Sequence, residues 1–509
     1  MSATGARTEP VDDDARPGAA DRPLAAVPGS GVTPGSWAAP LARNLVWNAA
    51  SELAARGASL WLAFACARVL PVSAFGRFSF ALALSQYAWL AADASANSAY
   101  ATREVARIRA FDLPSARRLK GRILLMRLGA AAAVTAAFLA AAAFVPMPSD
   151  LRGAVAGASV FFLCYAAFPD WALRAREDFR GLAFANLAGA LALVAGTLLW
   201  LPRHPGAGVA AALWGASFAV SAAASLARLL RARAFAWGGD AGTPASHARR
   251  SVVFSVGAIA GIGCAQAPML IVGLLATPFD GGLFGAGYRF LLIVINTFSV
   301  LWWPLMPVLV RSKPGERDFR DALATMGGVV MLLGLPAALG FALWPSELLT
   351  LAFGAKYAAG APALRLAALV VPLFAANALL EQVSIALGRE GVRARVNTLA
   401  LAVLAATGIG LVPSRGPAGA SIALVVGYAV SASGYVLALR ASLPWRAMAM
   451  RIRQPLALNA VLAGAWLLAR AMHAPALPAI ALAAIAYVLA AIAGGSLRAF
   501  RPAPGEVLP

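Results

Sequence analysis

Charged side chains are scarce in this chain of 509 residues: they make up 13% of it, whereas 61% of the residues are hydrophobic. A soluble domain is about one quarter charged and about half apolar. So few charges cannot supply the water-facing shell that a soluble chain of this length needs. The composition therefore excludes a soluble enzyme and predicts a polytopic membrane protein.

Cysteine and histidine are almost absent, with three residues of each. Cys66, Cys164 and Cys264 lie in separate apolar runs, so none is placed for a disulfide. The histidines lie far apart, and no group has the spacing of metal ligands. The sequence also has no phosphate-binding Gly-Lys-Ser/Thr loop. We therefore expect no metal and no cofactor.

Acidic residues are also few, since 22 of them face 43 basic residues and leave a net charge of +21. In a soluble protein such an excess would suggest nucleic acid as a partner. In a membrane protein it is typical of basic cytoplasmic loops. We therefore expect no nucleic-acid partner.

Long apolar segments fill most of the chain after a polar start at residues 1–42, which is expected to be a disordered cytoplasmic tail. Each segment approaches or exceeds the ~20 residues that cross the hydrocarbon core as a helix. The predicted all-α fold has about 14 transmembrane helices, at residues 44–70, 75–97, 123–145, 152–172, 182–201, 207–227, 251–277, 283–309, 322–344, 366–388, 396–413, 417–439, 454–471 and 475–497.

The basic residues alternate between the predicted loops. With the N-terminus inside, most of the 43 basic residues fall in the inner loops and the tails, and few fall in the outer loops. This pattern follows the positive-inside rule and puts both termini in the cytoplasm. No loop is long enough for a separate domain, so the function is expected to reside in the membrane helices.

A faint repeat relates two parts of the chain, because Phe75-Gly76 and Phe284-Gly285 occupy similar places in their helices. It predicts two pseudo-symmetric six-helix lobes around a central cavity, at residues 43–233 and 250–440. Residues 441–509 would add two helices and a cytoplasmic C-terminus. Coincidence is an equally strong explanation, since Phe-Gly pairs are common in such sequences.

The first predicted helix carries a polar stripe with Asn48, Glu52 and Arg56 at spacings of four. These residues share one face, which cannot lie against lipid. Arg56 lies near mid-membrane and is a candidate ligand for an anionic cargo, because guanidinium binds phosphate oxygens in pairs. Alternatively, Glu52 and Arg56 form an i,i+4 pair that only fixes helix packing. Arg127 is expected to reach the inner surface with its side chain.

Other predicted helices carry further polar candidates. Arg289 and Asn296 lie in the eighth helix, and Gln86 and Asp93 in the second. Asp93 and Glu381, toward the inner ends of their helices, are candidates for coupling transport to an ion. For each carboxylate taken singly, an interfacial residue or a helix cap is the favoured explanation.

Five short motifs occur in an order that resembles polysaccharide and O-antigen flippases of the Wzx type, which belong to the multidrug/oligosaccharidyl-lipid/polysaccharide exporter superfamily. They are Ala67-Arg68-Val69-Leu70-Pro71 with Phe75-Gly76-Arg77-Phe78, Arg103-Glu104-Val105-Ala106-Arg107, Asp170-Trp171 with Arg174 and Glu177-Asp178-Phe179-Arg180, Gly282 to Arg289, and Phe353-Gly354-Ala355-Lys356-Tyr357. The resemblance covers about residues 43–400.

The resemblance implies a transporter rather than an enzyme, in the bacterial inner membrane. Its cargo would be undecaprenyl-pyrophosphate-linked oligosaccharide for surface polysaccharide, and membrane lipid and a polysaccharide polymerase would be its partners. By this reasoning Arg56 and Arg289 bind pyrophosphate, and Glu52 belongs to the same site. Asn48, Gln86 and Asn296 bind sugar hydroxyls.

Two other functions remain open on the sequence. An ion-coupled multidrug exporter of the same superfamily would favour acidic groups in its cavity, against which the mid-membrane arginine argues. A membrane-integral polysaccharide polymerase or acyl transferase would need a large outer loop with catalytic residues. The outer loops here are short, and their few carboxylates are Asp150, Asp280 and Glu347.

Overall fold

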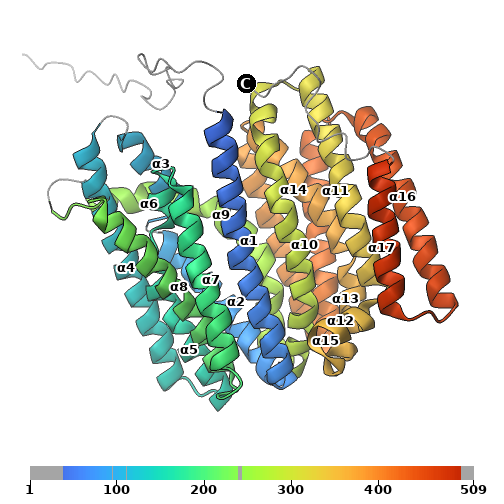
Figure 1. Ribbon diagram of the computed structural model, residues 1–509, viewed down its shortest axis with the longest axis horizontal. Helices are drawn as coiled ribbons and strands as arrows, with labels where there is room; N and C mark the ends of the chain where they lie inside the picture. The colour runs from blue at the N-terminus through green and yellow to red at the C-terminus, as the bar shows by residue number, and fades with distance from the viewer. Residues whose placement is uncertain (1–37, 95, 110–111, 239–242, 494–509) are drawn as a thin grey trace, which may run out of the picture.

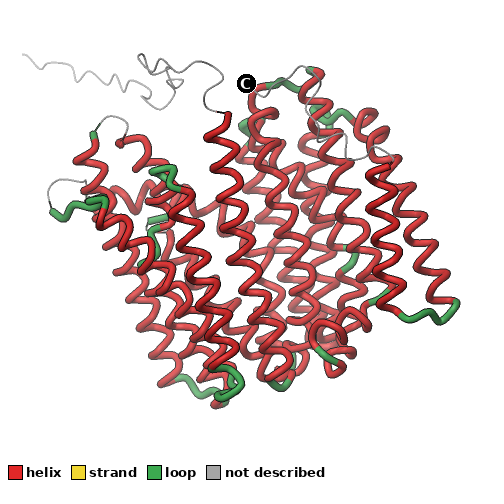
Figure 2. Tube along the Cα trace, viewed as in Figure 1, coloured by secondary structure: helices red, strands yellow, loops and turns green. Residues whose placement is uncertain are grey.

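The computed structural model describes residues 38–493 except 95, 110–111 and 239–242 (Figure 1). Within the helices, the side chains of 38–46, 91, 250, 253–262, 296, 299–308 and 310–311 are not described. Figure 2 shows helices joined by short loops, with no strand in the described ranges. The all-helical, polytopic fold expected from the composition is confirmed.

The helices are α1 Ala38–Val69, α2 Val72–Ala94, α3 Ser98–Arg109, α4 Leu113–Phe144, α5 Ser149–Ala166, α6 Asp170–Arg174, α7 Phe179–Leu199, α8 Ala207–Arg231, α9 Pro244–Leu275, α10 Pro278–Arg311, α11 Arg317–Leu343, α12 Pro345–Phe353, the 3-10 helix η1 Ala355–Gly360, α13 Ala361–Ala367, α14 Val370–Ala386, α15 Glu390–Leu439, α16 Trp445–Ala471 and α17 Ala476–Ala493.

The fourteen predicted membrane segments fall on helices wherever the structure describes them. Segments 152–172 and 366–388 each cover parts of two helices, and 494–497 of the last segment lie outside the described residues. Nine helices in the described part of the chain are long and apolar enough to cross a membrane, and a tenth span forms if Ala355–Ala367 is joined to Val370–Ala386 across a 46° bend. α1 and α2 are not among them, because polar side chains interrupt both helices. α15 counts once although it contains two of the predicted segments.

The 50-residue helix α15 is a hairpin. Gly416 breaks it with φ 50° and ψ −128°, between Pro413 and Pro417. The two arms then pack on each other: a Cβ added to Gly427 would lie 2.8 Å from the Cβ of Leu404. Small residues where the two arms meet allow the helices to approach closely.

The helices form two groups joined in the middle (Figure 1). α4, α5, α7 and α8 pack together in one group, and α10 to α17 make up the other. α1 packs on α7, while α2 packs on α5, α9 and α10. The predicted lobe boundaries at residues 233 and 250 stay a prediction.

Capping carboxylates begin two of the helices. Asp112 precedes α4 and accepts a hydrogen bond from the Ser115 amide at 3.0 Å. Asp178 precedes α7 and accepts one from the Gly181 amide, also at 3.0 Å. Each side chain satisfies an amide that has no partner within its helix. The caps fix where the chain turns back into the bundle, at the end where α1 begins (top of Figure 1).

Candidate functional site

The polar stripe of α1 contains an ion pair. Arg56 Nε lies 3.2 Å from Glu52 Oε2, and the two side chains are 34% and 31% exposed. The i,i+4 contact expected from the spacing therefore exists. Both groups also remain within reach of water or of a ligand.

Arg174 of α6 joins the same stripe from another element. Its Nη1 donates to Asn48 Oδ1 at 3.1 Å, and its Nη2 lies 3.4 Å from Glu52 Oε1. Its Nε lies 3.6 Å from Asp170 Oδ2. Glu52 therefore holds two arginines, one on each carboxylate oxygen. We call Asn48, Glu52, Arg56, Asp170 and Arg174 the Glu52 network.

The sequence did not identify Arg174 as a site residue. It lies 122 positions from Glu52, so no local spacing links the two. The available signals were its place four residues after Asp170 and its position in one of the motifs behind the family resemblance.

Asp93 lies in a separate and drier site. Its Oδ1 pairs with Arg127 Nη1 at 2.9 Å, and its Oδ2 accepts from Asn97 Nδ2 at 2.9 Å. The Arg127 side chain is 1% exposed and packs over the Trp89 ring at 5.1 Å. The expectation that Arg127 reaches the surface is therefore wrong. A carboxylate and an aromatic face hold it inside, where a charge needs such partners.

Gln86 links two helices. Its Oε1 accepts a hydrogen bond from Gln266 Nε2 of α9 at 2.7 Å. Any sugar hydroxyl at this position would compete with that contact. The side chain of Asn296 lies outside the described residues, so its predicted role stays a prediction.

Arg289 of α10 is a half-buried cation beside α1. Cys66 of α1 and Tyr288 are the ionisable groups close enough to act on it. Among the described residues, no hydrogen bond or ion pair reaches its guanidinium. Ten residues of α1 separate Arg56 from Cys66, a rise of about 15 Å along the helix. Two cationic positions therefore lie at different depths beside α1.

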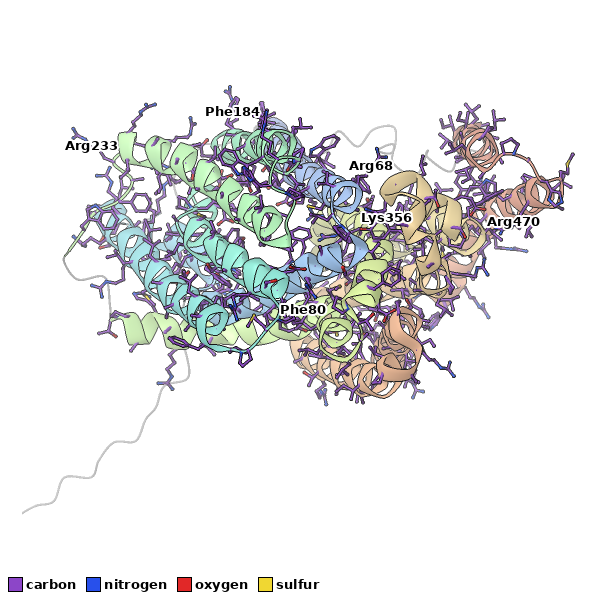
Figure 3. The ribbon with its side chains drawn as sticks, turned by 90° about the horizontal axis from the view of Figure 1, so that it is seen from below. Arg68, Phe80, Phe184, Arg233, Lys356 and Arg470 are labelled. Carbon is purple, nitrogen blue, oxygen red and sulfur yellow. The ribbon has the colours of Figure 1, made fainter. Side chains whose placement is uncertain are left out.

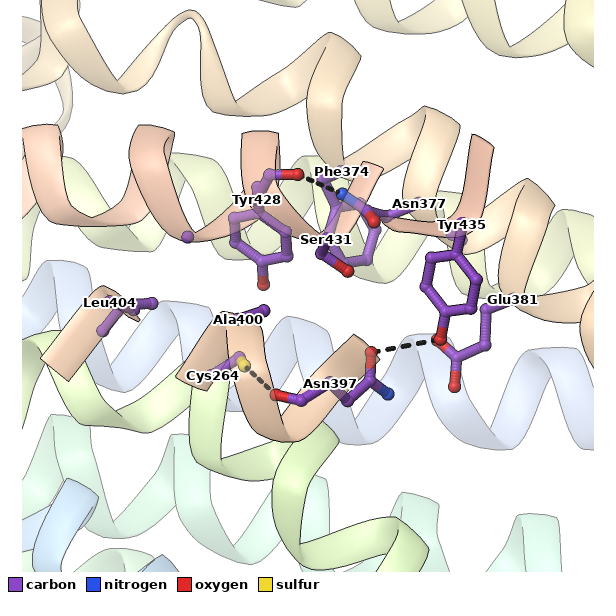
Figure 4. A pocket seen from close by; sticks show the side chains of 12 residues that line it. Cys264, Phe374, Asn377, Glu381, Asn397, Ala400, Leu404, Tyr428, Ser431 and Tyr435 are labelled. Carbon is purple, nitrogen blue, oxygen red and sulfur yellow. Dashed lines mark hydrogen bonds between the residues drawn. The ribbon is translucent and has the colours of Figure 1, made fainter. Parts of the chain in front are cut away.

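A small pocket with mainly apolar walls and a few polar side chains lies among α9, α14 and both arms of α15 (Figure 4). The space open to the centres of water molecules measures about 80 Å³. Glu381 lies at its edge and pairs with Arg393 Nε at 2.6 Å. The Tyr435 hydroxyl donates to Asn397 Oδ1 at 3.1 Å. The buried Asn377 Oδ1 has no partner among the described residues, so the pocket keeps a free acceptor.

The predicted coupling residues Asp93 and Glu381 are thus both paired with arginines. The structure places them in different halves of the molecule, one near α4 and one between α14 and α15. No group of three or more His, Cys, Asp or Glu suited to a metal ion occurs in the described ranges.

Three of the five motifs behind the resemblance, at residues 67–78, 282–289 and 353–357, meet at the opposite end of the bundle. A Cβ on Gly76 would collide with the Pro278 carbonyl, and one on Gly285 would lie 2.9 Å from Ser79 Oγ, so α2 and α10 touch backbone to backbone. Phe75 packs edge-on against Tyr357, with ring centroids 5.7 Å apart. We call the close approach of α2 and α10 at Gly76 and Gly285 the glycine seam.

Two basic side chains form hydrogen bonds at the end of the bundle that contains the glycine seam. Lys356 Nζ donates to the Leu70 carbonyl at 2.6 Å, and Arg68 Nη2 donates to the Leu351 carbonyl at 3.3 Å. Figure 3 looks at this end and shows Arg68 and Lys356 near the middle of the bundle. The molecule is therefore closed here by backbone and aromatic contacts.

No protein-family model and no curated protein sequence matches the chain. Solved structures do match. The lipid II flippase MurJ in an inward closed conformation aligns with a TM-score of 0.66 at 10% identity, over 89% of this chain and 100% of that one. An inward-facing multidrug resistance MATE family transporter of the MOP superfamily aligns with 0.61 at 15% identity, over 79% and 96%. The MATE multidrug transporter DinF-BH aligns with 0.61 at 14% identity, over 81% and 97%.

These alignments cover nearly the whole length of each neighbour at identities that carry the fold alone. The neighbours are transporters and flippases. The chain accordingly shares the multi-pass helical fold of these neighbours.

Proposed function

We propose that this protein is a flippase that moves undecaprenyl-pyrophosphate-linked oligosaccharide units across the bacterial inner membrane for surface polysaccharide. One observation carries the proposal: arginines lie at two depths beside α1. Arg56 and Arg174 are held in the Glu52 network, and Arg289 has no carboxylate partner among the described residues. Permanently charged guanidinium groups suit a pyrophosphate.

Glu52 acts in this proposal as a substitute for the cargo. Its carboxylate occupies the Arg56 and Arg174 guanidinium groups while no anion is bound. Pyrophosphate offers more oxygens and more charge, so it displaces Glu52 and takes both arginines. Arg289 then receives the head group about 15 Å farther along α1.

The rest of the cargo would follow the polar and apolar surfaces. Asn48, Gln86 and Asn296 would bind sugar hydroxyls, and the prenyl tail would stay in lipid. The glycine seam would part during the outward step, in an alternating-access cycle. Asp93 or Glu381 would couple the cycle to an ion gradient. No covalent chemistry is needed, so the protein is not an enzyme.

In this proposal both termini lie in the cytoplasm, because the basic loops lie on that side. The Glu52 network then faces the cytoplasmic leaflet, where the lipid-linked cargo is made. A polysaccharide polymerase would receive the cargo on the other side.

An ion-coupled multidrug exporter is the second candidate. The MATE transporters among the structural neighbours favour it, and so does the pocket edged by Glu381. A cationic drug would avoid Arg56, Arg174 and Arg289. Drug resistance conferred by the wild-type gene and abolished by Glu381→Gln, with normal polysaccharide, would select the exporter. A polymerase or acyl transferase would instead need catalytic residues that the short outer loops do not offer.

The deciding experiment measures on which face of membrane vesicles the lipid-linked oligosaccharide accumulates after deletion of the gene. We expect cytoplasmic-face accumulation that the wild-type gene reverses. Arg56→Ala and Arg174→Ala should each lower translocation at least about tenfold, the effect of about 1.4 kcal/mol. Arg320→Ala is the matched control, because Arg320 is exposed on α11. Normal translocation in the deletion strain rejects the proposal.

A further inference from the structure

Lys120 of α4 is a buried cation. Its relative exposure is 1%, and it belongs with Arg127 among the largest fully buried side chains. Arg127, two turns later on the same helix, has the Asp93 carboxylate and the Ser98 hydroxyl as partners. In the described part of the chain, Lys120 has neither a hydrogen bond nor an ion pair. Burying a charge in this way is costly unless something compensates it.

The charges around Lys120 make its burial worse. Arg176, Arg109 and Arg117 are the charged groups that act on it, and all three are positive. Burial, together with the nearby Arg109 charge, lowers the pKa of Arg176, which lies in the loop between α6 and α7. Lys120 therefore lies in a cluster of positive charges with Arg109, Arg117 and Arg176.

The nearby carboxylates are used elsewhere. Asp178 binds Arg228 through both oxygens, at 2.5 and 3.0 Å. Glu104 binds Arg107 at 2.7 Å. Neither acts on Lys120. Among the described residues, Asp178 acts on Arg176, but no carboxylate acts on Lys120 itself.

Elements of the chain pack around the cluster of Lys120 and the three arginines. Arg109 Nη1 donates to the Ala175 carbonyl at 3.3 Å, which ties α3 to the loop after α6. The Ala236 amide donates to the Arg117 carbonyl at 3.1 Å. A Cβ on Gly121 would lie 2.5 Å from the Ala236 carbonyl oxygen, so the segment after α8 lies directly on α4. Lys120 is therefore enclosed by α3, α4 and two loops.

We propose that Lys120, with Arg117 and Arg176, binds a phosphate group at the end of the bundle where α1 begins, outside the cargo path. A phosphate oxyanion supplies the missing negative charge and accepts from several donors at once. Basic pockets at the membrane surface between helices suit the head groups of anionic lipids. Free inorganic phosphate has the same chemistry, and the experiment separates the two sources.

The test compares melting temperatures of the full chain in nanodiscs of phosphatidylcholine alone or with phosphatidylglycerol. Phosphatidylglycerol should raise the wild-type melting temperature by at least about 2 °C. Lys120→Met should melt higher than wild type in phosphatidylcholine, because it removes an uncompensated buried charge. It should also lose the response to phosphatidylglycerol.

Two variants control for side effects. Lys120→Arg keeps the charge and should keep the response, and Arg320→Gln removes an exposed charge elsewhere and should behave as wild type. If Lys120→Met does not fold, the double variant Arg117→Gln/Arg176→Gln takes its place, since both arginines are half-buried. It should lose at least half of the response.

The sources are separated by adding millimolar inorganic phosphate to the phosphatidylcholine nanodiscs. An equal rise there assigns the site to a soluble anion, and no rise assigns it to the lipid. The proposal is overturned if neither anion raises the wild-type melting temperature more than that of Lys120→Met. Transport is not measured, so this failure and that of the flippase proposal are independent.

Discussion

The two halves of the molecule stabilise their polar groups by different means. In the N-terminal half, ion pairs join separate elements: Arg127 with Asp93, Arg174 with Glu52, and Arg228 with Asp178. The C-terminal half also has such a pair, Arg393 with Glu381, but it relies mainly on amides and hydroxyls. Asn377 donates to the Tyr428 carbonyl at 2.8 Å, and Tyr435 donates to Asn397.

This difference matters because a broken ion pair costs more than a broken neutral hydrogen bond. Removing one member leaves a charge without compensation in a dry place. Removing an amide leaves a single neutral group unsatisfied. The dry Asp93–Arg127 pair is therefore expected to be the most sensitive to single substitutions, because the pairs of Arg174 and Arg228 are more exposed. It lies in the half that holds the proposed entry site for the cargo.

The largest effect is expected from Asp93→Asn. It leaves Arg127 buried with no counter-charge, at a cost of about 3–5 kcal/mol. Thermal unfolding of the purified protein measures the loss. The double variant Asp93→Leu/Arg127→Met should recover most of it. If Asp93→Asn is as stable as wild type, the two halves do not differ in the way described.

A smaller loss is expected from Asn397→Ala in the C-terminal pocket. It leaves the Tyr435 hydroxyl without its acceptor, at a cost of about 1–3 kcal/mol. The same unfolding assay measures it, with Ala400→Gly on the same arm as the reference for altered helix propensity. A loss larger than that of Asp93→Asn would reverse the order of the two halves.

Arg174→Gln should separate stability from transport. The Arg174 and Glu52 side chains are 27% and 31% exposed, so losing their pair costs about 0–1 kcal/mol. Translocation should nevertheless fall about tenfold or more, as for Arg174→Ala. Equal losses in folding and translocation would make Arg174 a packing residue.

The smallest effect is expected at Asp178, outside the membrane spans. Burial opposes its ionisation, but the hydrogen bonds from Arg228 and the Gly181 amide prevail and lower the pKa of Asp178. Its stabilisation is therefore present above the unfolded pKa of about 3.9 and is lost as pH falls through the lower, folded value. Asp178→Asn should cost under about 1 kcal/mol at pH 7, and the difference from wild type should vanish in acid melts.

The sequence predicted the helices well because each span needs a long apolar run, which is visible locally. It also predicted the Glu52–Arg56 contact, since four residues make one helical turn. The sequence could not predict the roles proposed for Arg174 and Lys120. Their surroundings come from elements far apart in the chain, and a basic residue near a predicted inner loop looks the same whether it is buried or exposed.

For the same reason, the sequence predicts the mutual positions of some site residues but not of others. Arg56, Glu52 and Asn48 share one helix face, and the structure brings them together with Arg174. Arg289 lies beside α1 only because α10 packs there, a contact that no spacing in the sequence encodes.

The single-residue break of α15 has a consequence for biogenesis. Because only Gly416 leaves helical geometry between the two arms, the turn offers only a short polar stretch, Ser414 and Arg415, to carry across the bilayer. The arms should enter the membrane together as a preformed hairpin rather than one after the other. A glycosylation tag inserted at this turn would then delay the insertion of both arms at once, while the same tag in the loop between α16 and α17 would not.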